Sequence, residues 1–248
     1  MITPELAYIA GFIIGDGNLS EKYLIRAVEE NKRFMKNVFL KAFHKAFNKL
    51  PKIYFDRFNN SYVAYLHSKE IWNVFVNELN IPTGKKSKIV RIPTPIMNSD
   101  VLSKASFLSA IFDAEGSVVE VKDPIHHPNG YPRIQLKVYN HKLAKDIFDL
   151  LIQFESKPKL YLYSDFAVIH INGRKNCKSF LEKIGFKHPL KNEKLNIFLA
   201  KDTGQGVCFC GKDNLLNKVS IAKAKVRNAS VARGLKGPKV TRTRPETA

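Results

Sequence analysis

The chain has 248 residues, of which 44% are hydrophobic, and its 41 Lys and Arg against 22 Asp and Glu give a formal net charge of +19. This length is enough for one large domain or two smaller ones with real cores, and the charge favours a polyanionic partner, nucleic acid before a membrane surface. Because no apolar run reaches the roughly 18 residues of a membrane span and the N-terminus has no signal-peptide pattern, the expected location is intracellular, in the cytoplasm.

The three cysteines do not indicate disulfides or zinc. Cys208 and Cys210 have no second pair to complete a four-ligand site. Cys177 shares an apolar helical face with Phe180 and Ile184 and is expected in the core. A disulfide framework and a structural zinc site are therefore both disfavoured.

The first stretch of the chain predicts a buried helix that ends on an acidic residue. Apolar side chains run from Leu6 to Ile14, Asp16 holds the last helical position, and Gly17 is interpreted as a left-handed helix terminus. The helix dipole places partial negative charge at this end. A carboxylate there costs a few tenths to about 1 kcal/mol unless a cation compensates it.

The rest of the first half is predicted from β-rich segments, Asn and Ser caps and apolar spacing. Two strands follow Gly17, and the second of them is expected at residues 22–28. A helix, a hairpin and a last helix follow at residues 31–50, 52–67 and 68–79. Residues 80–102 contain three prolines and a basic cluster and predict a linker.

The second half repeats this order. An apolar run from Phe107 ends at Glu115, 99 positions after Asp16, and Gly116 follows it. We predict strands at 117–122 and 133–139, a helix at 140–154, a hairpin at 158–173 and a helix at 175–184. The stretch from His126 to Gly130 is interpreted as the loop between the first two strands rather than as a His-Asn nuclease site. The predicted fold class is α+β, with two α-β-β-α-β-β-α repeats at residues 1–79 and 103–200.

Residues 201–248 differ in composition from the two repeats. They contain eleven Lys and Arg against three Asp and Glu. Apolar residues at helical spacing between 215 and 226 predict a basic amphipathic helix, and residues 236–248 are expected to be disordered. Two interpretations stay open: an extension that contacts phosphates, or a solvated tail with no specific role.

Strands that alternate apolar and polar residues predict sheets with one face on the helices and the other free to bind. In 133–139, for example, Ile134, Leu136 and Val138 alternate with basic, amide and aromatic residues. Such side chains suit phosphates and base edges in a DNA groove. The candidate DNA-binding residues are Arg26, Lys32, Lys52, Tyr54, Arg133, Gln135, Lys137, Tyr139, Lys159, Tyr161 and Tyr163.

The two acid-terminated helices carry small residues four apart, Gly11 with Gly15 and Ala110 with Ala114. Such residues share one side of a helix and let two backbones come close. If the helices pack along these sides, Asp16 and Glu115 meet at the same end. Paired carboxylates repel each other unless a hard divalent cation such as Mg²⁺ binds between them. The backbone carbonyls of Gly15 and Ala114 are further candidate ligands, and hydrolysis of a phosphodiester is the predicted chemistry.

The segments "IAGFIIGDG" (9–17) and "LSAIFDAEG" (108–116) resemble the two nine-residue motifs of LAGLIDADG homing endonucleases, in the form where one chain carries both. The resemblance covers residues 4–200 and extends weakly to "GKKSKIVRIP" and "HPLKNEKL". It implies a pseudo-twofold, monomeric saddle whose antiparallel sheets lie on double-stranded DNA. It also implies that Asp16 and Glu115 bind catalytic Mg²⁺, with Mn²⁺ as a substitute, and cut both strands of a long asymmetric target.

The same resemblance implies basic or amide side chains beside the scissile phosphates. Lys137 and Gln135 are the candidates in the second half. In the first half, the corresponding strand ends in Glu29 and Glu30, so that Arg26 or Lys32 takes the role.

Other functions on the same scaffold stay open as alternatives. One is an RNA maturase that binds intron RNA, and another is a DNA-binding protein that does not cleave. Such proteins tend to lose the acidic residues, whereas both are present here, which favours cleavage. An intein is disfavoured because the chain shows no flanking splicing segments and ends in "RPETA".

Overall fold

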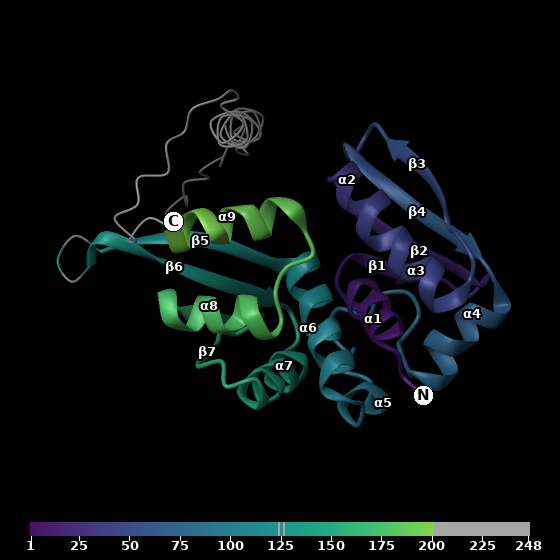
Figure 1. Ribbon diagram of the computed structural model, residues 1–248. Helices are drawn as coiled ribbons and strands as arrows, with labels where there is room; N and C mark the ends of the chain where they lie inside the picture. The colour runs from purple at the N-terminus through teal and green to yellow at the C-terminus, as the bar shows by residue number, and fades with distance from the viewer. Residues whose placement is uncertain (124, 126, 201–248) are drawn as a thin grey trace, which may run out of the picture. The chain divides into compact units, whose positions relative to one another are not determined.

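The computed structural model describes residues 1–123, 125 and 127–200 (Figure 1). These residues form two α+β halves, each built on a four-stranded antiparallel sheet. The strand orders are β1-β2-β4-β3 and β5-β6-β8-β7. This matching order confirms the predicted fold class and the predicted repeat. The expectations for 201–248, with Cys208 and Cys210, and for His126 lie outside the described residues.

The first half follows the predicted order of elements. Asn31 and Ser68 cap helices as predicted, since their side chains accept hydrogen bonds from the backbone N–H groups of Phe34 and Ile71. The helix predicted at 31–50 contains a π-helical turn, and so does the one at 68–79. The elements are α1 (Pro4–Asp16), β1 (Gly17–Leu19), β2 (Leu24–Glu29), α2 (Lys32–Phe34), η1 (Met35–Phe39), α3 (Leu40–Phe47), β3 (Lys52–Asp56), β4 (Ser61–His67), α4 (Lys69–Asn73) and η2 (Val74–Glu78).

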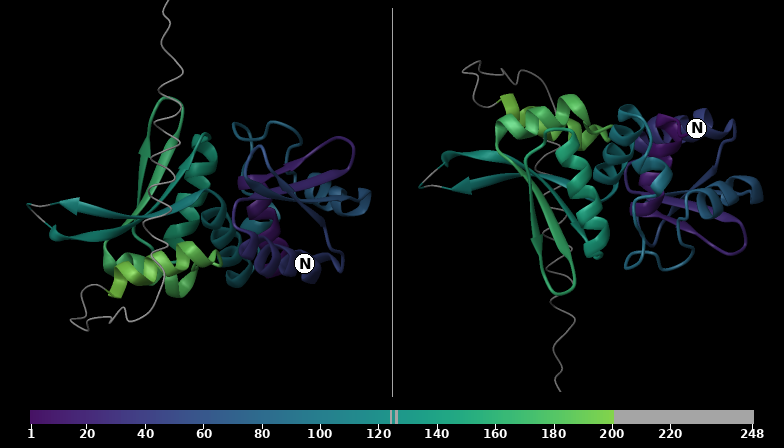
Figure 2. Two further views of the ribbon diagram at one scale, coloured as in Figure 1. Left: turned by 90° about the horizontal axis from the view of Figure 1, so that it is seen from above. Right: turned by 90° about the horizontal axis from the view of Figure 1, so that it is seen from below.

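The second half differs from the prediction in two places. The predicted loop is shorter, because β5 and β6 form a long hairpin that extends beyond the other strands of their sheet (Figure 2). Helix α9 was not predicted, because its only buried residue is Leu195 and it has no apolar stripe. The elements are α5 (Thr94–Met97), α6 (Val101–Glu115), β5 (Gly116–Asp123), β6 (His127–Val138), α7 (His141–Gln153), β7 (Pro158–Leu162), β8 (Ala167–Asn172), α8 (Arg174–Lys183) and α9 (Pro189–Ala200).

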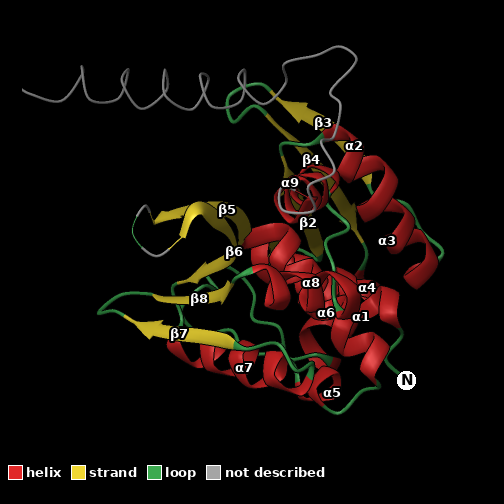
Figure 3. Ribbon diagram, turned by 60° about the vertical axis from the view of Figure 1, so that its left-hand side comes forward, coloured by secondary structure: helices red, strands yellow, loops and turns green. Residues whose placement is uncertain are grey.

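Each sheet buries one face, as the alternation predicted. In the second half, α7 contacts β7 and β8 while α8 contacts β6 and β8 (Figure 3). Ile134, Leu136 and Val138 are buried on the covered face, and the residues between them are at least partly exposed. Cys177 lies in this core with no exposed surface, as predicted.

Helices α1 and α6 lie side by side at the centre of the described residues (Figure 1). Both are buried along most of their length.

The glycines that follow these two helices are not left-handed, in contrast to the prediction for Gly17. Its φ is −106°, and the φ of Gly116 is −76°. Glycine is needed for space instead, because a Cβ at Gly17 would lie 2.5 Å from Cα of Ile13, and one at Gly116 would lie 2.5 Å from the Phe112 carbonyl oxygen.

The segment between the halves, 80–102, contributes to the core rather than merely connecting the repeats. It includes α5, and its buried side chains include Ile81, Val90 and Ile96. Lys86 from this segment is also buried, with 8% of its surface exposed.

Among the described helices, none combines the length and apolar character that crossing a membrane requires.

Candidate active site

The packing of α1 on α6 places two acidic residues together. A Cβ built on Gly11 would lie 2.6 Å from the Phe107 carbonyl oxygen and 2.9 Å from Cβ of Ala110. One turn further, a Cβ on Gly15 would lie 2.5 Å from Cβ of Ala114. The predicted small-residue contact is therefore confirmed at both turns. The backbones stay close up to the helix ends, where Asp16 and Glu115 are the last helical residues.

The charge of Glu115 acts on the carboxyl group of Asp16. Burial, the charge of Glu115 and the charge of Glu29, in that order, raise the pKa of Asp16 to about 6. Partial burial also raises the pKa of Glu115, which is the more exposed of the two. Both groups thus hold protons more tightly than an isolated carboxylate does. A bound cation would relieve this repulsion.

Two lysines supply positive charge at the same helix ends. Lys86 Nζ donates to the Gly17 carbonyl oxygen at 2.5 Å, just past the end of α1. Lys191 Nζ donates to the carbonyl oxygens of Phe112, Asp113 and Ala114, the last of these at 3.1 Å. Both lysines lower the pKa of Asp16 and of Glu115. They also offset the partial negative charge at the ends of the two helix dipoles.

Asp113 of the second motif fixes the chain that carries Lys191. Its buried carboxylate accepts hydrogen bonds from the Tyr8 hydroxyl at 2.6 Å and from the backbone N–H groups of Lys187 and His188 at 3.2 and 3.0 Å. These bonds join α1 and α6 to the start of α9. Burial raises the pKa of Asp113 to about 6 although the bonds from Tyr8 and His188 lower it.

A second contact between the halves runs through His188. Its Nδ1 accepts from the Lys191 N–H at 3.4 Å, and its Nε2 lies 3.6 Å from Oε1 of Glu29. The ring of His188 stacks on Phe34, with 4.9 Å between ring centroids. Glu29 also accepts from the Asn31 N–H at 2.8 Å. Glu29, which stands where a basic residue was expected, is therefore held beside α9.

The ammonium groups at the carboxylates are those of Lys86 and Lys191, which were not among the predicted site residues. Lys137 Nζ instead lies 4.0 Å from the ring centroid of Phe166 and 5.0 Å from that of Tyr139. Neither Lys137 nor Gln135 is among the groups that shift the pKa values of the two carboxylates. The segments that hold the two lysines are the ones to which the resemblance extended weakly.

The predicted DNA-binding residues lie on or beside the open faces of the sheets. The exposed ones are Lys32, Lys52, Tyr54, Lys137, Tyr139, Lys159, Tyr161 and Tyr163, and the partly exposed ones are Arg26, Arg133 and Gln135. Lys32 lies on α2 rather than on a strand, and its Nζ is 5.8 Å from the ring centroid of Tyr62. The faces thus present basic, amide and aromatic groups together.

The donor set at the helix ends fits a hard divalent cation. It consists of carboxylate and carbonyl oxygens, the ligands that Mg²⁺ prefers. The Ala114 carbonyl oxygen, a predicted ligand, already accepts from Lys191. Among the described residues, no group of three His, Cys, Asp or Glu side chains forms a ready-made metal site. Asp16 and Glu115 would therefore need oxygens from DNA or water to complete the coordination.

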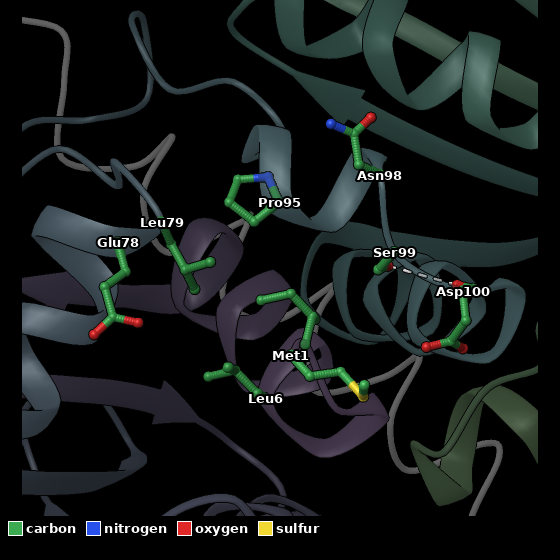
Figure 4. Close-up of a pocket in the computed structure, with 9 residues that line it drawn as sticks. Met1, Leu6, Glu78, Leu79, Pro95, Asn98, Ser99 and Asp100 are labelled. Carbon is green, nitrogen blue, oxygen red and sulfur yellow. Dashed lines mark hydrogen bonds between the residues drawn. The ribbon is translucent and has the colours of Figure 1, made fainter.

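A surface pocket lies at the opposite ends of the same helices. It is lined by residues from the N-terminal end of α1, from η2 and from the segment before α6, including Met1, Leu6, Leu79 and Asp100 (Figure 4). Leu6, which lines the pocket, is ten residues before Asp16 on α1, so about 15 Å of helix separates the two. The pocket is not part of the carboxylate site.

Comparisons with known proteins agree with this fold. A LAGLIDADG-like domain is recognised over residues 103–185. The homing endonuclease I-ApeI of Aeropyrum pernix is 23% identical over 204 residues, which cover 79% of this chain and 87% of that protein. The solved structure of I-DmoI in complex with DNA and calcium is 18% identical and has a TM-score of 0.55, covering 79% of this chain and 97% of that one. This likeness shows a shared fold.

Other relatives are much longer proteins. The replication factor C small subunit of Methanocaldococcus jannaschii is 28% identical over 90% of this chain, and the tRNA-splicing ligase RtcB of Pyrococcus furiosus is 30% identical over 76% of it. The chain spans only 11% and 22% of these two proteins.

Proposed function

We propose that this chain is a LAGLIDADG homing endonuclease, a site-specific endonuclease that hydrolyses both strands of duplex DNA. The observation that carries the proposal is the meeting of Asp16 and Glu115 at the shared end of α1 and α6. Each half of the chain contributes one carboxylate and one sheet. A single chain therefore supplies both carboxylates and both sheets, which supports action as a monomer, and a DNA target favours a location inside the cell.

Asp16 and Glu115 would hold the divalent ions, with Mg²⁺ as the proposed cofactor and Mn²⁺ as a substitute. When bound, the ions would activate a water molecule and stabilise the leaving oxygen of the phosphodiester. The raised pKa of Asp16 supports this assignment, since it reflects burial next to another negative charge. The donor atoms at the helix ends are all carboxylate or carbonyl oxygens, and such ligands favour Mg²⁺ over softer metals.

Lys86 and Lys191 are proposed to hold positive charge beside the scissile phosphates. Each ammonium group is anchored on carbonyl oxygens at the end of a motif helix. Burial lowers the pKa of both lysines while the neighbouring carboxylates raise it. A fixed ammonium group in such a place stabilises the charge that develops on the phosphate during hydrolysis.

The long relatives support a module that works independently of its surroundings. A replication factor C small subunit and a tRNA-splicing ligase have unrelated names, yet both match most of this chain. The shared segment therefore does not carry the activity that either name describes. DNA cleavage by the segment itself is consistent with its presence in both.

Selection of cleaved sites from a random duplex DNA library tests the proposal. With Mg²⁺, we expect recovery of one asymmetric target of about two helical turns, because two unlike halves face two half-sites. A palindromic target would contradict the role of the two halves, and no cleavage of any duplex would contradict the function. A parallel binding assay with structured RNA separates a maturase, which would bind RNA without cutting DNA.

A further inference from the structure

The strand register aligns two rows of side chains that are equivalent in the two halves. In the first half, Arg26 pairs with Asn18 on one side and with Tyr65 on the other, and Tyr65 pairs with Lys52. Residues directly opposite each other in antiparallel strands project from the same face. We call this set row A; it consists of Asn18, Arg26, Tyr65 and Lys52.

The second half contains the same row. Gln135 pairs with Ser117 and with His170, and His170 pairs with Lys159. We call this set row B; it consists of Ser117, Gln135, His170 and Lys159. Each row begins two residues after its carboxylate, at Asn18 after Asp16 and at Ser117 after Glu115. The rows therefore hold matching places relative to the proposed cleavage centre.

The rows agree at one end and differ in the middle. Both end in an exposed lysine, Lys52 or Lys159. Their second residues, on the strands β2 and β6, differ: row A has Arg26 where row B has Gln135. In the major groove, Arg pairs with the O6 and N7 acceptors of guanine, whereas Gln pairs with N6 and N7 of adenine. Equivalent places thus carry side chains that prefer different bases.

The side chains of Arg26 and Gln135 are both available for contact with a base. Within the described residues, Gln135 makes no side-chain hydrogen bond, and the side-chain bond of Arg26 is a long one of 3.5 Å to the Tyr54 hydroxyl. Arg133, on the same strand as Gln135, is different. Its guanidinium donates to Asn172 Oδ1 at 2.6 Å and to the Tyr131 hydroxyl at 3.1 Å. Arg133 is therefore partly satisfied by the protein itself.

We infer that Arg26 and Gln135 are equivalent specificity-determining residues, so that the DNA target has guanine at one position of the first half-site and adenine at the matching position of the second. This inference rests on the proposed function, because it places both sheet faces in the major groove. It assigns to Gln135 a role in base recognition rather than in catalysis. These two residues therefore predict one base difference between the two half-sites of the target.

Exchange of the two side chains tests the inference. Bound duplexes are selected from a random DNA library with the wild type, with Arg26→Gln, with Gln135→Arg and with Arg33→Gln as the matched control, and cleavage of the selected sites is measured separately. We expect Arg26→Gln to change one guanine to adenine and Gln135→Arg to change one adenine to guanine, each by about 5- to 150-fold in preference. Arg33→Gln removes the same charge from an exposed position on α2, outside the predicted DNA-binding set, and should leave the preference at both positions unchanged.

The outcomes separate the inference from the proposed function. Preferences that stay the same in both exchange variants, or that change equally in the control, overturn the inference even if cleavage is intact. The expected exchange without cleavage by the wild type supports the inference and overturns the proposed function. Absence of any enriched duplex for the wild type overturns both. Circular dichroism of each variant confirms that it is folded, and a double variant, Arg26→Gln with Gln135→Arg, should exchange both positions at once.

Discussion

Gly15 faces Ala114 across the α1–α6 interface so closely that a Cβ on Gly15 would lie 2.5 Å from the Cβ of Ala114. The same added atom would lie 3.4 Å from Cγ of Glu115. The contact that joins the two halves is thus next to the carboxylates. Any change in the helix spacing here would also move Asp16 relative to Glu115.

Gly15→Ala is expected to destabilise the protein by about 1–3 kcal/mol, because the added methyl group overpacks the interface. Ala114→Gly removes the atom that it would meet, so the double variant should recover part of the loss. Unfolding by urea measures the coupling free energy between the two positions, which we expect to exceed about 0.5 kcal/mol. Simple additivity of the two single variants would contradict the contact.

Asp16→Asn or Glu115→Gln is expected to reduce DNA cleavage by on the order of 10³-fold or more, because each removes a charged oxygen ligand. Binding of the uncut target should persist, since the sheets supply the DNA contacts. Single-turnover cleavage and gel-shift measurements on the same target distinguish the two effects. Substantial cleavage by either variant would refute its catalytic role.

Lys86→Met and Lys191→Met are each expected to slow cleavage by on the order of 10²-fold, as loss of a positioned charge commonly does. Both lysines lower the pKa values of Asp16 and Glu115. The acidic limb of the pH–rate profile should therefore move to higher pH in the variants. Lys88→Met is the control, because Lys88 is exposed two positions from Lys86. An equal loss in the control would point to general charge instead of a positioned group.

Stability without metal should depend on pH through Asp16. Its pKa is about 6 in the folded protein, against about 3.9 in an unfolded chain. Between these two values the folded protein keeps a proton on Asp16 that the unfolded chain has released. The stability that this proton contributes to the folded state is therefore lost as the pH rises from about 4 to 6. Asp16→Asn removes the charge and should be more stable than the wild type at pH 7.5 by on the order of 1 kcal/mol.

Thermal unfolding in EDTA at pH 4 and pH 7.5 measures this difference. The stability advantage of Asp16→Asn should be small at pH 4, where the wild-type carboxyl is protonated. Divalent ions at pH 7.5 should stabilise the wild type more than the variant. An advantage of the same size at both pH values would contradict the assigned pKa.

Local patterns were enough to predict the central helices and the repeat. Apolar runs that end in Asp16 and Glu115, with small residues four apart, describe both helices and their contact within a few residues each. Alternation along the strand at 133–139 likewise identified its buried face. These features depend on neighbours in sequence, so the sequence alone contains them.

The lysines at the site depend on contacts between distant parts of the chain. Lys86 is 69 positions from Gly17, and Lys191 is 77 positions from Ala114. The family resemblance extended weakly to the segments around them, but among 41 Lys and Arg the sequence did not place either one at the carboxylates. The prediction for Gly17 was wrong for a local reason: its backbone is extended, and glycine is required because a Cβ there would lie 2.5 Å from Cα of Ile13.

Metal binding by the paired carboxylates is tested most directly by a crystal structure of the protein with its selected DNA target and Mn²⁺, measured at the manganese absorption edge. We expect anomalous density between the DNA backbone and the carboxylates of Asp16 and Glu115, with the DNA cut on both strands. Cut DNA in a crystal whose manganese lies away from both carboxylates would contradict it.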